Sequence, residues 1–426
     1  MFTSPTGGTI SIPELLAHER VQRLERRFVT AADLLRWPQI NYDGAGMPSM
    51  TPVKFTDNPA DDSSPNVPAK WPYIEFPDLS TSSDTFTISP FTTSRDGKLL
   101  AAVEGTLGII VWRLSDGLVV QRLGGQGHTA PICAIAFSPD SRTLVSGSAD
   151  ETAIVWSIRT GQAIFRLEGH RAAVDSVTYN SDGSLVVTAS GTGSTLKFWD
   201  ASSGMPLCTF HHSWWIAGFL LSQKGSKLAV QLEEGVALYQ AGSGGPIVQL
   251  GVVTTPHSRK VAAVAFSPDG DRLFMSDNWT DARVYDTDSC ETLVEFNPAY
   301  VYGTVLSAAF TPDSTKLATI SGARVIPIWS FKKGGGQPQS LIHMGLSGTA
   351  VAFSPSGAFL AAAGDASGGA AIRVWDWKSR KLVVEFTAPA SEIGVIKFLP
   401  DSRSLLTFAK AGSVCLWNVA DALRLR

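Results

Sequence analysis

Several features that mark particular protein classes are missing from this sequence. No apolar run approaches the roughly 20 residues that span a bilayer, and the opening residues MFTSPTGGTISIPELL lack the basic and apolar regions of a secretory signal. The four cysteines are widely spaced and form no C-x-x-C pair, which excludes a zinc ribbon and a disulfide framework. We therefore expect no membrane partner, and a location in the cytoplasm, the nucleus or both.

Charge is also scarce. Charged residues make up 17% of the 426 positions and the formal net charge is -3, whereas charged residues are about a quarter of a typical globular chain. A chain so close to neutrality has no overall field that would hold a polyanion, so we do not expect a nucleic-acid binder. The 39 glycines and 24 prolines instead indicate many turns, which favours β structure over long helices.

A repeat of about 43 residues is the most specific feature that is present. A turn-like tetrapeptide such as SPDG recurs eight times, and an aromatic residue follows each turn after 15–19 residues. The third turn residues are Asp96, Asp140, Asp182, Lys224, Asp269, Asp313, Ser356 and Asp401. The aromatic markers are Trp112, Trp156, Trp199, Tyr239, Tyr285, Trp329, Trp375 and Trp417. The nearly constant spacing between these two markers, repeated eight times, predicts eight copies of one structural unit.

Each copy is expected to form four short strands. In the second copy, residues 131–137, 143–147, 152–156 and 162–167 are rich in β-branched and apolar residues and are bounded by turn residues. Four antiparallel strands in about 43 residues correspond to one blade of a β-propeller. The sequence thus predicts an all-β, eight-bladed propeller, with a seven-bladed ring as the alternative.

The motifs of these copies resemble those of the WD40-repeat family, to which G-protein β subunits belong. Gly-His precedes the first strand at Gly127-His128 and Gly169-His170, and Trp-Asp ends the third strand at Trp199-Asp200 and Trp375-Asp376. The resemblance covers about residues 72–426. It implies a structural network of His128, Asp150 and Trp156 with a Ser or Thr, and only the second copy carries all three. Elsewhere, apolar packing between blades is expected to provide most of the stability.

The chain divides into three expected parts. Residues 1–40 are predicted to form a helical extension, residues 41–70 a Pro-rich linker, and residues 71–426 the propeller. A helix over 11–28 begins with a Ser11/Glu14 capping pair and packs either on the propeller or on a partner. Few residues follow Trp417, so we expect residues 71–77 (WPYIEFP) to supply the outer strand of the last blade and close the ring.

Exposed aromatic residues in loops give the candidate site. In the resembled family, the connections between blades and the turns between second and third strands share the face that usually docks partners. This face should carry the aromatics Trp214, Trp215, Trp279, Tyr300 and Tyr302 and the carboxylates Glu233, Glu234, Asp277 and Asp281. Such a set suits a protein or peptide segment, including a basic or methylated-lysine side chain. The alternative is that these aromatics only pack the blades.

No residue set completes a catalytic or metal site. The segment GDASGG at 364–369 has no matching His and acid, KKGGG at 332–336 lacks a phosphate-loop pattern, and His211, His212 and His257 have no ligands at suitable spacing. We therefore expect a non-enzymatic interaction scaffold with no cofactor and no metal. A substrate receptor of a cullin-RING ubiquitin ligase, suggested by RVWDWK at 373–378, and an enzyme with a site on a propeller face are the alternatives.

Overall fold

The computed structural model describes most of the chain after residue 89. The described ranges are 90–124, 127–222, 226–242, 246–255, 259–279, 281–296, 303–331, 337–366, 369–388, 392–409 and 413–420. Before them, only the backbone of four short strands is described, namely β1 (Phe2–Thr3), β2 (Thr9–Ile10), β3 (Lys54–Asp57) and β4 (Pro72–Phe76). The helix expected over 11–28 lies outside the described residues.

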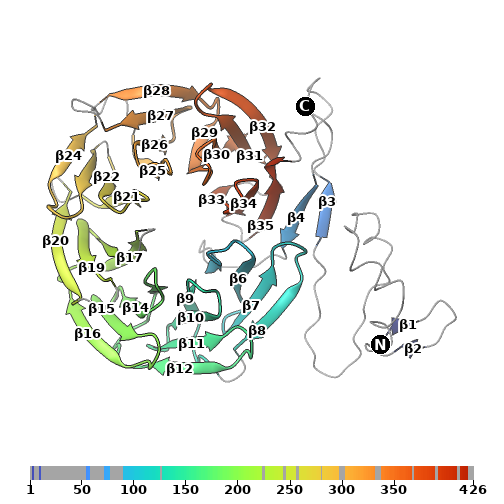
Figure 1. Cartoon of the computed structure of the whole chain (residues 1–426), viewed down its shortest axis with the longest axis vertical. Coiled ribbons are helices and arrows are strands. Elements are labelled where there is room, and N and C mark those ends of the chain that lie inside the picture. The colour runs from blue at the N-terminus through green and yellow to red at the C-terminus, as the bar shows by residue number, and fades with distance from the viewer. Residues whose placement is uncertain are drawn as a thin grey trace.

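Eight antiparallel sheets stand radially around a common centre (Figure 1). Blades 1 and 2 comprise β5 (Phe91–Thr93), β6 (Leu99–Glu104), β7 (Gly108–Arg113), β8 (Val119–Leu123), β9 (Ile132–Phe137), β10 (Thr143–Ser148), β11 (Ala153–Ser157) and β12 (Ala163–Leu167). Blades 3 and 4 comprise β13 (Ser176–Tyr179), β14 (Leu185–Ser190), β15 (Thr195–Asp200), β16 (Pro206–His211), β17 (Ile216–Leu221), β18 (Lys227–Leu232), β19 (Gly235–Gln240) and β20 (Val248–Thr254).

The second half of the ring repeats this order. Blades 5 and 6 comprise β21 (Val261–Phe266), β22 (Arg272–Asp277), β23 (Ala282–Asp286), β24 (Thr292–Glu295), β25 (Val305–Phe310), β26 (Lys316–Ser321), β27 (Val325–Ser330) and β28 (Pro338–His343). Blade 7 comprises β29 (Ser347–Phe353), β30 (Phe359–Ala366), β31 (Gly369–Asp376) and β32 (Lys381–Thr387), and blade 8 begins with β33 (Ile393–Phe398), β34 (Ser404–Ala409) and β35 (Val414–Asn418). The expected all-β, eight-bladed propeller is confirmed.

The recurring turn residue holds the hairpin between the first and second strands of a blade. In blade 2, the Ser138 hydroxyl donates to Asp140 Oδ1 (2.6 Å), and the same carboxylate oxygen accepts from the backbone N–H of Arg142 (3.0 Å). Asp96, Asp269 and Asp313 make equivalent pairs of contacts. The side chain replaces a missing backbone partner, which is why Asp recurs at this turn position.

The aromatic marker of each copy packs between neighbouring blades. Trp329 of blade 6 is fully buried and stacks on Phe296, next to blade 5, with ring centroids 4.1 Å apart. Trp417 of blade 8 lies 5.0 Å from Phe386 of blade 7. The remaining fully buried markers are Trp112, Trp156, Trp199 and Tyr239. Apolar layers between blades therefore form the core, as the sequence pattern predicts.

Blade 8 is built from distant parts of the chain. β4 lies antiparallel to β35, with Phe76 opposite Val414 and Tyr73 opposite Trp417. β4 thus takes the outer position that the sequence indicates for residues 71–77. β3 then pairs with the far edge of β4, which makes this blade five-stranded. β3 falls within 41–70, a range expected to be a linker; the division of the chain into domains stays a prediction.

Candidate functional site

The turns between second and third strands and the connections between blades meet on one face. The backbone N–H of Val261, the first residue of β21, donates to the Glu233 carbonyl in the β18–β19 turn (3.0 Å). The N–H of Asn278, in the β22–β23 turn, donates to the Lys260 carbonyl (3.0 Å). The Thr304 hydroxyl then reaches the Asn278 carbonyl (2.8 Å). These bonds fix the loops of blades 4, 5 and 6 in one layer.

Three indole side chains on this face are exposed to solvent. Trp214 and Trp215, in the connection before β17, are 40% and 47% exposed, and Trp279 in the β22–β23 turn is 61% exposed. Trp215 also lies over Gly191 in the β14–β15 turn of blade 3, where an added Cβ would stand 2.2 Å from its Nε1. The other two expected aromatics, Tyr300 and Tyr302, lie outside the described residues.

Asp277, one of the expected carboxylates, is not on the surface. Its side chain is fully buried and its Oδ2 pairs with the Arg259 guanidinium (3.2 Å), while Oδ1 accepts from the backbone N–H groups of Trp279 (2.9 Å) and Asp281 (3.0 Å). Arg259 in turn covers the Trp279 ring at 5.0 Å. Asp277 therefore organises the turn and cannot contact a partner, and one face of Trp279 already holds a cation.

The remaining carboxylates fall into two kinds. Asp281 pairs with Arg283 (2.9 Å), which also reaches Glu295 (3.2 Å). Glu233 is exposed and Glu234 is half-buried, and neither carboxylate has a hydrogen-bond or ion-pair partner among the described residues. The part of the site open to a ligand thus consists of three indoles and these two glutamates.

A buried polar network joins β10 and β11 of blade 2 to the connection before β9 and to the β10–β11 turn. The Trp156 Nε1–H donates to the Ser146 hydroxyl (2.8 Å), which contacts His128 Nε2 (2.7 Å), and His128 Nδ1 contacts Asp150 (3.0 Å). Burial lowers the pKa of His128, so the ring is neutral at pH 7. The only consistent arrangement then has Ser146 donating to Nε2 and Nδ1–H donating to Asp150.

Shorter versions of this network occur in three other blades. Nε1 of Trp199, Trp329 and Trp417 donates to a threonine hydroxyl, on Thr188 (2.8 Å), Thr319 (2.8 Å) and Thr407 (2.9 Å), respectively. In blade 3, His170 extends the chain from Thr188 (2.7 Å) to Thr195 (3.1 Å). Polar bonds therefore supplement apolar packing in more blades than the sequence indicates. The sequence pattern that would have predicted these bonds is a Ser or Thr ten or eleven positions before the tryptophan.

His170 makes stability depend on pH. Burial, with a smaller effect of Lys197, lowers the pKa of His170 to about 4, whereas an unfolded histidine titrates near 6.5. The unfolded chain takes up this proton first, so stability is complete above about pH 6.5 and falls as the pH drops toward 4. When the pH falls from about 7 to about 5, the free energy of unfolding of the wild type should decrease by about 2 kcal/mol more than that of His170→Gln. Urea unfolding at both pH values measures this, and equal losses would contradict it.

Several residues of the other sequence motifs make contacts within the fold. Within 364–369, Asp365 of β30 pairs with Ala370 of β31, and residues 367 and 368 lie outside the described part. His212 Nε2 contacts the Tyr239 hydroxyl (2.8 Å). Trp375 is buried and Asp376 accepts backbone N–H groups of the next turn. Residues 332–336 and His257 lie outside the described part. Within the described part, no group of three or more His, Cys, Asp and Glu side chains could hold a metal, and no helix is long and apolar enough to span a membrane.

Comparison with known proteins identifies the repeat. The family model "WD domain, G-beta repeat" matches residues 119–157, 161–200 and 343–376. A guanine nucleotide-binding protein subunit beta of Oryza sativa subsp. japonica is 27% identical over 48% of this chain and 58% of its own length. Protein FIZZY-RELATED 3 of Arabidopsis thaliana is 27% identical over 34% of this chain and 31% of its own length. The chain thus spans between a third and three-fifths of these relatives.

A solved structure supports the same architecture. The computationally designed Ika8 protein superposes with a TM-score of 0.61 at 23% identity, covering 80% of this chain and 99% of that one. At this identity the likeness concerns the fold alone. The three matched repeats, with the eight radial blades, show that the chain is a WD40-repeat β-propeller protein with distant homologues among G-protein β subunits.

Proposed function

We propose that this protein is a non-enzymatic scaffold that docks a protein or peptide segment on the loop face of blades 4 and 5. WD40 propellers typically serve as protein-interaction scaffolds, and the matched relatives belong to that group. The observation that carries the proposal is the exposure of Trp214, Trp215 and Trp279 on one face. Exposed tryptophans are strongly enriched among residues that dominate binding energy.

The chemistry of the open surface indicates the kind of segment that would bind. The indoles offer apolar area, and Glu233 and Glu234 offer negative charge that no described residue neutralises. Asp277 and one face of Trp279 are already occupied by Arg259, so a closed cage around a methylated lysine is not the arrangement we propose. A segment with an apolar or aromatic anchor and a flanking basic side chain fits best.

We further propose that the segment 11–28 supplies a second contact, and that the protein acts in the cytoplasm, the nucleus or both. Two distant relatives support this location by name: a pre-mRNA-processing factor 19 homolog of Arabidopsis thaliana and a U3 small nucleolar RNA-associated protein 15 homolog of Xenopus tropicalis.

The triple variant Trp214→Ala/Trp215→Ala/Trp279→Ala tests the docking face. Loss of three exposed anchors should weaken capture of specific partners at least about tenfold, because single anchors contribute about 2 kcal/mol or more. Affinity purification with quantitative mass spectrometry measures the change, after thermal unfolding has shown that the variant folds.

The matched control removes exposed apolar side chains in or next to the outer strands of blades 1, 3 and 5, away from the loop face. Leu118→Ala/Leu207→Ala/Leu293→Ala changes residues that are 56%, 51% and 48% exposed, and it should leave the partner list unchanged. An unchanged list for the tryptophan variant would refute this docking face.

A further inference from the structure

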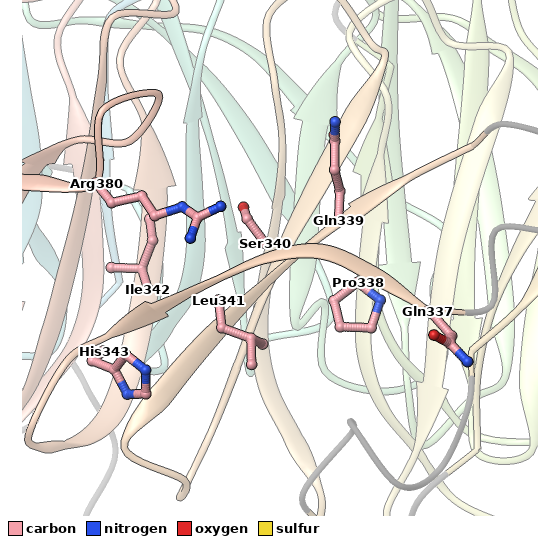
Figure 2. Close-up of a pocket in the computed structure, with 8 residues that line it drawn as sticks. All are labelled: Gln337, Pro338, Gln339, Ser340, Leu341, Ile342, His343 and Arg380. Carbon is pink, nitrogen blue, oxygen red and sulfur yellow. The ribbon is translucent and has the colours of Figure 1, made fainter.

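An open groove lies on the outer rim, apart from the loop face. It has a volume of about 510 Å³ and is lined by β28 and the residue before it, 337–343, and by Arg380 in the β31–β32 turn of blade 7. Figure 2 shows the Arg380 guanidinium extending toward Ser340 of β28. β28 is the edge strand of blade 6, so every second backbone N–H and C=O faces away from β27, on the side of the groove.

Three basic side chains gather around this groove. Lys316 contacts Gln339, one of the lining residues, and its Nζ lies 5.5 Å from the Trp377 ring. Lys378 Nζ approaches the same ring at 5.9 Å. Among the described residues, no carboxylate forms an ion pair with Lys316, Lys378 or Arg380. The charge of Lys316 helps to lower the pKa of Asp313, and the charge of Lys378 helps to lower the pKa of Asp376. The rim of blades 6 and 7 is therefore a cationic edge beside a free strand.

The backbone of Arg380 adopts a left-handed conformation that is unfavourable for an arginine. Its φ is +59°, and the equivalent turn positions of blades 1, 2 and 3 carry Gly117, Gly161 and Gly204 at φ of +68° to +72°. Glycine adopts this left-handed conformation freely, whereas a residue with a Cβ is strained by about 1 kcal/mol. The equivalent position of blade 5 also carries a residue other than glycine, Cys290 at φ +60°, and nothing in the turn itself requires an arginine at position 380.

Blade 8 shows that an outer edge of this propeller accepts a further strand. There β3, from a segment far from the blade's own hairpins, pairs antiparallel with β4 from Lys54 opposite Glu75 to Asp57 opposite Pro72. Blade 6 has the same four-stranded architecture with its edge open. Addition of an extended segment to an exposed edge is a general mode of peptide recognition, with backbone bonds giving affinity and side-chain contacts giving selectivity.

We infer that β28 is a second docking site, which takes an extended acidic segment of a partner protein as a fifth strand of blade 6. The segment's backbone pairs with β28 along the groove, and its carboxylates lie against Arg380, Lys316 and Lys378. This surface is separate from the loop face, so it could recruit one protein while blades 4 and 5 hold another.

Fluorescence anisotropy with two labelled octapeptides tests the inference on the full chain. EVEVEVEV alternates acidic and apolar residues and should bind, while KVKVKVKV should bind at least about tenfold more weakly because its charge repels the groove. Raising the ionic strength from about 0.05 to about 0.3 M should weaken the EVEVEVEV complex. The EVEVEVEV peptide can be N-methylated at its odd or at its even residues. One of these two patterns should abolish binding, because it removes the N–H groups that donate to the backbone of β28.

Arg380→Gly separates recognition from folding. Glycine suits the left-handed position, so this variant should unfold at the same temperature or higher while binding EVEVEVEV at least about fivefold more weakly. Arg159→Glu, in the corresponding turn of blade 2, is the matched control and should bind normally. Absence of EVEVEVEV binding, equal binding of both peptides, or full binding by Arg380→Gly would each overturn the inference.

Discussion

Replacing Trp329 with alanine is expected to lower the free energy of unfolding by about 4–5 kcal/mol. The indole is fully buried, stacks on Phe296 with ring centroids 4.1 Å apart, and donates its Nε1–H to Thr319 (2.8 Å). Alanine would leave a cavity between two blades and an unpaired threonine hydroxyl, because a close-packed interior collapses only in part. Urea unfolding followed by tryptophan fluorescence and circular dichroism measures the loss.

Two controls separate packing from the hydrogen bond. Trp329→Phe keeps an aromatic ring against Phe296 but removes the donor to Thr319, and it should cost about 2 kcal/mol. Trp214→Ala removes an indole of the same size from the surface and should cost less than about 0.5 kcal/mol. A loss for Trp329→Ala no larger than that of Trp214→Ala would show that the layers between blades do not provide the stability assigned to them.

Removing the Asp150 carboxylate should have the next largest effect, a loss of about 3 kcal/mol. Its two oxygens accept from His128 Nδ1 (3.0 Å), the Thr129 N–H (2.9 Å) and both the N–H and the hydroxyl of Thr152 (3.0 and 2.7 Å). Asp150→Ala leaves these donors without a partner while His128 stays buried. Chemical unfolding at neutral pH measures the change.

The pKa of Asp150 provides an independent check. Burial alone would raise it, but the hydrogen bonds from Thr152, Thr129 and His128 lower the pKa to about 2. The carboxylate therefore stabilises the fold above its unfolded pKa of about 3.9, and this stabilisation is lost as the pH falls toward 2. Asp140→Ala, in the exposed turn of the same blade, is the control and should lower the free energy of unfolding by less than about 1 kcal/mol. A decrease equal to that of Asp150→Ala would contradict the importance of the buried network.

The repeat pattern was sufficient to predict the fold because each of its two markers makes contacts within or beside its own blade, and every blade requires these contacts. The Asp of each turn bonds to its own hairpin, and the aromatic residue fills the layer beside the next blade. Both roles depend on residue type and spacing alone. β3 could not be found in this way, since Lys54–Asp57 has neither marker and is defined only by its pairing with β4.

The candidate site was predicted less completely for a different reason. Sequence spacing places Trp279 in an exposed turn, and the structure agrees. The same spacing cannot show that Asp277 turns inward, because that depends on Arg259, which reaches the turn from the connection before β21. Whether a loop carboxylate faces solvent or caps backbone N–H groups is decided by such non-local contacts.

The pairing of β4 with β35 has a consequence for synthesis of the protein on the ribosome. β4 emerges early, but the strand it must pair with, β35, is translated only after the seven other blades. During elongation each of blades 1 to 7 gains its fourth strand soon after its third, whereas β4 can pair only with β3, and its other edge stays unpaired until β35 has been made. The last strands, β33 to β35, therefore determine when the ring closes, and a ribosome that stalls before them leaves an unpaired edge of β4 for chaperones to shield.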